Sequence, residues 1–164
     1  IIDSKSGMSG AGKKSVEDNL KLQLNNNFYS YSVTSHKHFP EIDQEIKKVN
    51  KKISFTFVPN ILPIFCGLQS NIYINQKDLK LKEIKEAIDS YYDGEFFIKT
   101  KNEKPVQLSE VQGTNNVFIN IFEDYEKKSF LLISSIDNLI KGAAGQAIQN
   151  MNLMFGFQEN ESLV

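Results

Sequence analysis

Pro40 fixes the start of a helix directly after two histidines, within residues 36–42 (His-Lys-His-Phe-Pro-Glu-Ile). Proline suits the first helical position, because its φ is already close to the helical value and the N–H group it lacks would have no partner there. The apolar residues that follow recur at i, i+4 and i+7, as Ile42, Ile46 and Val49. The segment therefore predicts a helix from Pro40 to about residue 50, with both imidazoles just before it.

Two histidines and a carboxylate at one helix end are suited to proton transfer, because histidine titrates nearest to neutral pH. His38 and Glu41 are therefore candidate catalytic residues. Two alternatives stay open from the residues alone. The histidines can be ordinary polar surface, or His36 and His38 can point the same way in an extended loop and bind a metal with Glu41. The chain has no further histidine to complete such a site, and we expect no metal.

The composition is that of a soluble globular domain. A chain of 164 residues with a net charge of −1 can form one well-cored domain, and it has no charge excess that would attract nucleic acid or an anionic membrane. Its longest apolar run is broken by Pro63, which excludes a transmembrane span. The single cysteine, Cys66, excludes an internal disulfide framework and fits a reducing compartment, so we expect a cytoplasmic protein.

Two further features concern binding and the limits of the chain. All 19 basic residues are lysine, so any bound carboxylate or phosphate must be held by lysines, hydroxyls, amides or helix ends and not by guanidinium groups.

The chain opens without Met on Ile1-Ile2-Asp3, as if a strand were entered partway through. We expect that a longer protein has been cut there.

Strand and helix patterns interleave along the chain. The strands are expected at about residues 1–4, 28–33, 53–58, 68–75, 96–98, 117–122 and 129–136, and the helices at about 40–50, 79–92 and 138–155. Residues 6–12 hold three glycines among other small residues, which predicts a loop whose backbone closely approaches another group. Residues 13–27 are expected to be irregular or weakly helical, and 158–164 to be loose. This order favours an α+β fold, with a mostly antiparallel sheet and helices packed on one face.

Three separated motifs carry a resemblance to a known family: Ser4–Gly12, His36–Ile42 and Asp137–Asn152. In this order and at these spacings they resemble the C-terminal half of the N-acetyl-γ-glutamyl-phosphate reductases, within the aspartate-semialdehyde-dehydrogenase-like family. The stretches 57–63 and 111–115 are similar as well, so the resemblance covers essentially the whole chain.

The resemblance implies one half of a two-domain enzyme of arginine biosynthesis. An N-terminal Rossmann half would bind most of the NADP and supply a nucleophilic cysteine. That cysteine forms a thioester from the acyl phosphate, which is then reduced to the semialdehyde. The C-terminal half, with a fold like that of the C-terminal domain of glyceraldehyde-3-phosphate dehydrogenase, supplies the acid/base histidine, substrate contacts and subunit interface. Residues 1–140 would be the substrate and dimerisation domain, and 141–164 a helix and tail that pack on the absent NADP-binding domain.

The resemblance also implies site residues. By motif position His38 is similar to the acid/base histidine, and Glu41 orients it or contacts the substrate. Tyr31, His36 and Lys37 are expected to bind the substrate. Lys37 stands where relatives often have arginine, and both Lys37 and Glu41 can instead be solvated side chains. Cys66 does not match the nucleophile, and we expect a packed thiol.

The glycine-rich segments are expected to contact the cofactor. The resemblance assigns this role to Ser6, Gly7, Ser9, Gly10, Gly142, Gln146 and Asn150. An ordinary turn at the first segment, or tight helix–sheet packing at the second, would account for the same residue types.

The expected partners are an acyl-phosphate substrate, the chain's own Rossmann domain, and further copies that form a homodimer or tetramer through one face of the sheet. The fragment alone is expected to be inactive. Two alternatives remain: a related reductase acting on aspartyl or aminoadipyl phosphate, and a dimerisation or metal-binding module without catalysis.

Overall fold

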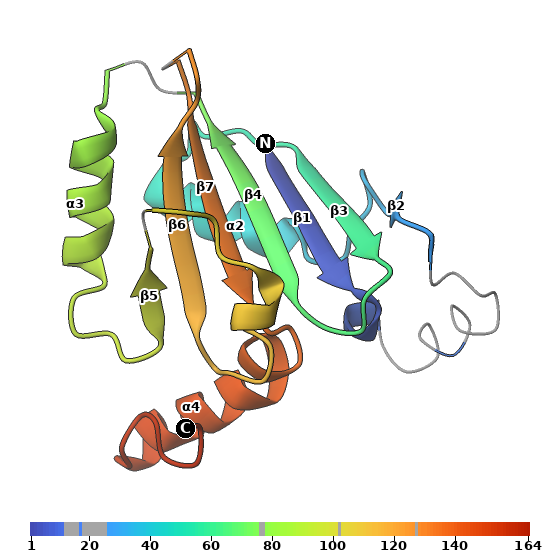
Figure 1. Ribbon diagram of the computed structural model, residues 1–164, viewed down its shortest axis with the longest axis vertical. Coiled ribbons are helices and arrows are strands. Elements are labelled where there is room, and N and C mark those ends of the chain that lie inside the picture. Colours follow the sequence, from blue (N-terminus) through green and yellow to red (C-terminus); the bar gives the residue numbers. More distant parts are fainter. Residues whose placement is uncertain (12–16, 18–25, 76–77, 102, 127) are drawn as a thin grey trace.

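The computed structural model describes residues 1–11, 17, 26–75, 78–101, 103–126 and 128–164, which form one seven-stranded sheet (Figure 1). The strands are β1 (Ile2–Gly7), β2 (Tyr29–Ser30), β3 (Phe57–Leu62), β4 (Leu68–Ile74), β5 (Ile98–Thr100), β6 (Val117–Glu123) and β7 (Phe130–Ile136). Their order across the sheet is β2-β3-β1-β4-β7-β6-β5.

The sheet is mixed, which corrects the expectation of a mostly antiparallel one. The pairs β1/β3 and β5/β6 are parallel, and the other pairs between described strands are antiparallel. A parallel pair needs a long crossover. The segment from Met8 to Thr56, which contains β2 and the helix after the histidines, is such a crossover. Periodicity along one strand does not reveal which strand lies beside it, so the predicted strand directions in the sheet were wrong. The α+β class is confirmed.

The helices are α2 (Phe39–Val49), α3 (Leu81–Tyr91) and α4 (Gly145–Phe155), with short turns η1 (Met8–Ala11), η3 (Leu108–Glu110) and η4 (Ile140–Ala144). In Figure 1, α2 crosses behind the sheet, α3 stands beside β5 and β6, and α4 lies beyond the strand ends. Of these three helices, α2 lies on one face of the sheet, as expected. α3 lies along an edge of the sheet, and α4 lies beyond the ends of its strands. Among the described residues, no helix is both long enough and apolar enough to cross a membrane.

The boundaries of β4, β6, β7 and α3 agree with the sequence patterns to within about two residues, but those of β1, β2 and β3 do not. β1 continues to Gly7, so the first two residues of the predicted 6–12 loop belong to a strand, and β2 is only two residues long. The alternating pattern ended at Pro59, whereas β3 continues through Pro59 to Leu62. Proline is tolerated near the edge of a sheet, where its missing N–H group has no required acceptor. Within the described part of the chain, β2 with its two residues is the only strand outside β3, and it pairs with Asn60 and Ile61 beyond the proline.

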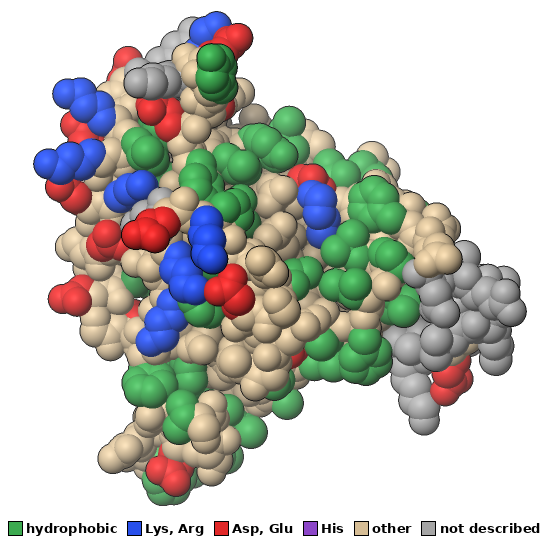
Figure 2. All heavy atoms as spheres, viewed as in Figure 1, with side chains coloured by type: hydrophobic (Ala, Val, Ile, Leu, Met, Phe, Trp, Pro, Cys, Tyr) green, Lys and Arg blue, Asp and Glu red, His purple; other side chains and the backbone are tan. Residues whose placement is uncertain are grey.

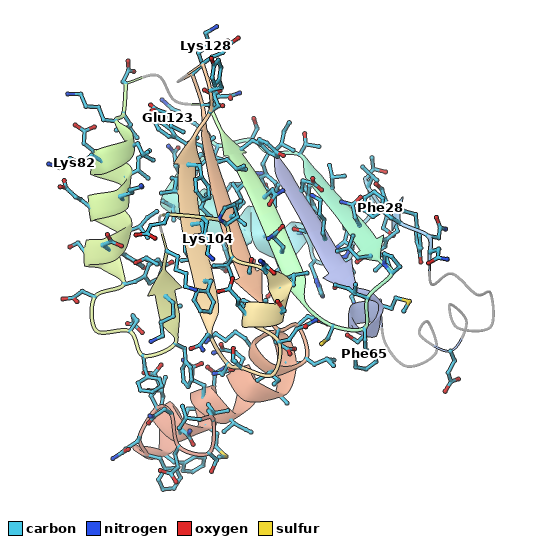
Figure 3. All side chains as sticks on the ribbon, in the orientation of Figure 1. Phe28, Phe65, Lys82, Lys104, Glu123 and Lys128 are labelled. Atoms are coloured by element: carbon cyan, nitrogen blue, oxygen red, sulfur yellow. The ribbon has the colours of Figure 1, made fainter. Side chains whose placement is uncertain are left out.

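One face of the sheet is partly covered by residues 103–112, which cross in front of β6 and β7 in Figure 1. The buried Asn120 of β6 holds this segment in place. Its amide group donates to the carbonyl oxygens of Lys101 and Lys104, and its side-chain oxygen accepts from the Val106 N–H at 3.3 Å. Lys104 therefore lies over the sheet in Figure 3.

The remainder of that face, over β4, β1 and β3, presents hydrophobic side chains around one lysine–aspartate pair (Figure 2). The pair is Lys5 and Asp3, which are salt-bridged. The strand register places the apolar Val58, Tyr73 and Leu131 on the same face as Asp3, together with the polar Asn60, Gln69 and Asn71. Tyr73 is 44% exposed, so this part of the sheet includes accessible apolar surface.

The end of β1 is pressed directly against the turn between β3 and β4. The Gly7 N–H donates to the Gly67 carbonyl oxygen at 2.8 Å, and the Ser9 N–H donates to the Phe65 carbonyl oxygen at 3.0 Å. A Cβ atom at Gly7 would lie 2.6 Å from the Phe65 oxygen and 2.9 Å from the Cys66 nitrogen. The Phe65 side chain points outward and is 61% exposed (Figure 3). Only glycine permits this approach of two backbones.

We predict that Gly7→Ala lowers the free energy of unfolding by about 1–3 kcal/mol, because the added methyl group meets backbone that cannot move aside without opening the turn. Urea denaturation monitored by circular dichroism measures this loss. Gly142→Ala is the matched control, since a Cβ there meets Ile136 Cδ1 at an ordinary 3.5 Å. Equal stability of the two variants would contradict the packing described here.

Candidate functional site

Asn138, which follows β7, connects the glycine-rich loop to the turn before β4. Its Nδ2 donates to Ser9 Oγ at 2.9 Å, and its Oδ1 accepts from the Gly67 N–H at 2.6 Å. A Cβ at Gly10 would lie 3.5 Å from Asn138 Nδ2, and one at Gly142 would lie 3.7 Å from Asn138 Cβ. The structure thus brings both glycine-rich segments to one side chain, as neighbours on either side of Asn138.

The adjacent Asp137 is buried and accepts three backbone hydrogen bonds. Its Oδ1 accepts from the N–H groups of Leu139 at 2.7 Å and Ile140 at 3.1 Å, and its Oδ2 accepts from the Gly113 N–H at 2.8 Å. The first two bonds cap η4, because the opening N–H groups of a helix have no partner within it. The third ties the 111–115 segment to the same point. Three of the sequence motifs therefore meet at residues 137 and 138.

A network of buried amide side chains holds α4 on the domain. Gln149 Oε1 accepts from Asn115 Nδ2 at 3.0 Å and from Lys141 Nζ at 2.6 Å, and Gln149 Nε2 donates to Glu159 Oε1 at 2.6 Å. Gly145 permits the contact, since a Cβ there would lie 2.3 Å from Asn115 Oδ1. Burial lowers the pKa of Lys141, while Glu159 and Glu95 oppose this effect.

The C-terminal tail is held as well, which corrects the expectation that 158–164 is loose. Asn152 is 2% exposed and donates to the carbonyl oxygens of Glu159 at 3.2 Å and Glu161 at 2.9 Å. On the outer side of α4, Gln146 Nε2 donates to Asn150 Oδ1 at 2.8 Å. These two predicted cofactor ligands therefore face outward as a pair, one turn beyond Gly142.

The second cluster comprises Tyr31, His36 and His38, before and at the start of α2. Tyr31 Oη lies 3.1 Å from His36 Nε2, and the His38 backbone N–H donates to His36 Nδ1 at 3.2 Å. The His36 ring also packs edge-on against the rings of His38, at 5.1 Å between centroids, and of Phe57, at 5.2 Å. The structure therefore brings these three predicted residues together.

These contacts set the protonation state of His36. Because Nδ1 accepts from a backbone N–H, the proton of the neutral ring is on Nε2, which donates to the Tyr31 oxygen. Burial lowers the pKa of His36, and His38 and Lys37 lower it further by charge repulsion. Burial raises the pKa of Tyr31, with a smaller effect from Tyr29. Both side chains are thus neutral near pH 7.

The remaining predicted residues around α2 are exposed. His38 is the N-terminal flanking residue of the helix, and its imidazole does not cap it. Lys37 precedes it, and Glu41 lies in the first helical turn, where the helix dipole favours a negative charge. One cationic and one anionic residue thus stand within three positions of the exposed His38 along the chain. Among the described residues, no group of three histidine, cysteine, aspartate or glutamate side chains could hold a metal ion.

The two clusters lie at opposite ends of the paired strands β1 and β3. His36 packs on Phe57, which pairs with Ile2, whereas Ser9 follows Gly7, which pairs with Leu62. At about 3.3 Å per residue, the ends of β1 are about 17 Å apart along the strand. The structure thus groups the predicted residues in two places. Gly12 of the glycine-rich loop lies outside the described range, as do 13–16 and 18–25 of the segment predicted to be irregular or weakly helical.

Cys66 has the surroundings of a packed thiol. Burial raises its pKa, Asp137 raises it further, and a hydrogen bond with the Gln112 side chain acts in the opposite direction. A raised pKa disfavours the thiolate that a nucleophile requires. This agrees with the prediction that Cys66 is not the catalytic cysteine.

The sequence analysis missed Asn138, Asp137 and Asn115 as individual residues. Each is polar and stands close to a glycine in a motif, and two of the three are buried. That pattern is a usable signal, because a buried amide or carboxylate must bond to nearby backbone. It does not reveal which distant segment supplies the partner.

Comparison with known proteins places these features in a family. Residues 1–138 match the family model described as semialdehyde dehydrogenase, dimerisation domain. N-acetyl-gamma-glutamyl-phosphate reductases from Ehrlichia canis and Methanocaldococcus jannaschii are 40% and 44% identical to the chain, over 99% of its length and 48% of theirs. The chain thus spans about half the length of the curated relatives it matches.

Solved structures share the fold at low sequence identity. Aspartate semialdehyde dehydrogenase from Francisella tularensis superimposes with a TM-score of 0.69 at 16% identity, covering 93% of this chain and 57% of that one. Aspartate semialdehyde dehydrogenase II from Vibrio cholerae gives 0.67 at 19%, covering 94% and 54%. These likenesses concern the fold alone.

We predict that Asn138→Ala weakens the anchoring of the glycine-rich loop. The Gly67 N–H loses its acceptor and Ser9 Oγ loses its donor, at a cost of about 1–3 kcal/mol in the free energy of unfolding. Hydrogen exchange of the Gly67 amide should accelerate. Asn138→Asp is the matched control, since a carboxylate still accepts from Gly67; acceleration in both variants would argue against this bond.

The lowered pKa of His36 predicts a pH dependence of stability. Below the ordinary pKa of 6.5 the unfolded chain binds the proton more readily than the folded one. The contribution of His36 is therefore complete above that value and is lost as the pH falls from it through the lower pKa of the folded state. Urea denaturation from pH 8 to pH 5 should give a shallower decline for His36→Asn than for the unsubstituted protein. Identical slopes would contradict the shift.

Proposed function

The chain belongs to the semialdehyde dehydrogenase family, whose dimerisation domain it contains, and on this premise we propose that it is one half of an N-acetyl-γ-glutamyl-phosphate reductase. In this role it binds substrate, supplies the acid/base group and forms the subunit interface of an NADP-dependent enzyme of arginine biosynthesis. The observation that carries the proposal is the exposed His38 imidazole at the start of α2, beside a histidine whose tautomer is fixed.

His38 is proposed to manage the proton of the reduction. A cysteine of the other half would carry the acyl group as a thioester, and NADPH supplies the hydride. As the hydride reaches the acyl carbon, negative charge develops on the acyl oxygen, and His38 as imidazolium donates its proton there. In the earlier step the same cation stabilises the thiolate by ion pairing. An exposed imidazole can reach a substrate that a second domain holds against this surface.

The neighbours of His38 are proposed to bind the substrate. Tyr31 accepts from His36 and can donate its own hydroxyl hydrogen to a substrate oxygen. Lys37 is exposed and attracts the acyl phosphate or the carboxylate as a point charge, since the chain has no arginine. Glu41, in the first turn of α2, orients the His38 imidazolium by charge attraction.

The residues around Asn138 fit a contact with the nicotinamide end of NADP. Gly10 and Gly142 are exposed, so their backbone can approach a ligand closely, and Ser6 and Ser9 offer hydroxyl groups. Gly7 is used differently, because it shapes this loop by packing against the turn before β4. Gln146 and Asn150 add an outward amide pair.

Residues 141–164 are proposed to pack on the cofactor domain, and 1–140 to form the substrate and dimerisation domain. The support is apolar surface on the outer side of α4 and just beyond it: Leu153 is 58% exposed, Met154 81%, Phe155 70% and Phe157 57%. A soluble protein rarely leaves so contiguous an apolar patch uncovered.

The open sheet face over β4, β1 and β3 is proposed to be the subunit interface of a homodimer or tetramer. Its apolar residues surround one ion pair, and Tyr73 remains accessible. This arrangement is the one expected of a domain like the C-terminal domain of glyceraldehyde-3-phosphate dehydrogenase. Burying this face would complete a core that one chain leaves open.

The full-length protein tests this function. We expect NADP- and phosphate-dependent oxidation of N-acetylglutamate semialdehyde, the reverse of the reduction, monitored by NADPH absorbance. His38→Ala should lower kcat by about 10²–10⁴-fold with an unchanged circular dichroism spectrum, because the proton donor is lost.

The same assay with aspartate semialdehyde and with the aminoadipate analogue is the control for substrate identity. Preference for either would refute the proposed substrate, and near-normal turnover of His38→Ala would refute the role of that residue. His38→Asn, which keeps a polar side chain at the helix start, should be as impaired as His38→Ala.

A further inference from the structure

Both ring nitrogens of His36 are engaged within the chain. Nδ1 accepts from the His38 backbone N–H at 3.2 Å, and Nε2 faces Tyr31 Oη at 3.1 Å. An imidazole has only these two polar atoms. A substrate oxygen could bind His36 only by displacing the His38 N–H or the Tyr31 hydroxyl group from the ring.

We infer that His36 is a positioning residue, which holds the imidazole of His38 in place and does not itself bind the substrate. This inference rests on the proposed function, because it concerns the same reaction. The family resemblance implied that His36 binds the substrate. Here its role is to position His38, the residue that acts on the substrate.

The backbone around His36 supports this role. The His36 carbonyl oxygen accepts from the Phe39 N–H at 3.0 Å, while its ring accepts from the His38 N–H, so one residue binds two successive positions of the turn that opens α2. The His38 carbonyl oxygen then accepts the first helical bond, from Ile42. The direction in which His38 leaves the backbone is therefore set by the orientation of the His36 ring.

Ring packing fixes that orientation. The His36 ring meets three other rings edge-on, with centroid distances of 5.4 Å to Tyr31, 5.1 Å to His38 and 5.2 Å to Phe57. Phe57 is buried in the sheet, so the contact connects His36 to the rigid part of the domain. The His38 ring thus rests on a side chain held by two hydrogen bonds and by β3.

Electrostatics favour the same assignment. A protonated His36 could no longer accept from the His38 N–H, and it would repel an imidazolium at His38. Burial, and charge repulsion from His38 and Lys37, lower the pKa of His36 and favour its neutral form. A neutral, fully bonded ring is suited to support and not to proton transfer.

Kinetics of three variants in the full-length enzyme test the inference. His36→Ala removes both bonds, and we expect kcat to fall at least about 10-fold with KM within about 2-fold, since misplacing a catalytic group costs turnover and not binding. His36→Asn keeps an oxygen at the position of Nδ1 and should recover most of kcat. His36→Gln keeps only a donor toward Tyr31, and we expect that it does not recover kcat.

A raised KM with kcat preserved in His36→Ala would overturn the inference while leaving the proposed function intact. Equal impairment of the His36→Asn and His36→Gln variants would also overturn the inference. Absence of reductase activity in the unsubstituted enzyme would be a different result: it would refute the proposed function, and the inference would fall with it.

Nitrogen-15 NMR of the imidazoles provides a readout that does not depend on activity. We expect His36 near pH 7 in the tautomer protonated on Nε2, with an unprotonated Nδ1. His36→Asn should leave the His38 amide resonance nearer its original position than His36→Gln does. Protonation on Nδ1 would overturn the inference, because that nitrogen could not accept from His38.

Discussion

The hydrogen bonds of Asp137 and Asn138 are the constraint on which the rest of this domain depends. Two consecutive polar side chains bind four separate segments: a serine hydroxyl in the loop after β1, and backbone N–H groups in the turn before β4, in the loop at Gly113 and at the start of η4. Each buried N–H group left without an acceptor would cost about 1–3 kcal/mol. A negative charge at the opening of a helix is also favourable. These bonds therefore fix the neighbouring ends of β1, β4 and β7 at one point. They also set the position of the glycine-rich loop.

The histidine cluster depends on a different kind of constraint. Pro40 and the bonds to the His36 ring and carbonyl oxygen determine where α2 begins, and the contact with Phe57 fixes this start against β3. The two clusters are connected through β1 and β3, which pair in parallel along their whole length. A rigid pair of strands thus holds the histidine cluster at one end and the glycine-rich loop at the other.

Much of the fold was predictable from local patterns. The start of α2 follows from Pro40, and the helical period of the residues after it predicts its length. Strands β4, β6 and β7 follow from short apolar stretches with turns on both sides. The patterns failed at Pro59, because proline is tolerated where only a two-residue strand lies outside. They also failed at the tail, whose polar composition gave no sign that the Asn152 side chain holds it from within α4. The first error concerns a partner strand about 30 residues away, and the second concerns a side chain that bonds to backbone past the end of its own helix.

The sequence by itself determined the secondary-structure elements, the α+β class and the chemical types of the candidate site residues, because these depend on neighbours within a few positions along the chain. It also determined that any anion held by this chain is bound without arginine. Only the tertiary structure decided that β1 lies parallel to β3 and that Asn138 joins the loop after β1 to the turn before β4. These contacts cross many residues, and partners at that separation are chosen by chain topology and packing, which no local pattern contains. The two bonds of the His36 ring are local, with Tyr31 and with His38, but their geometry depends on the conformation of the backbone before α2, which the residue types do not specify.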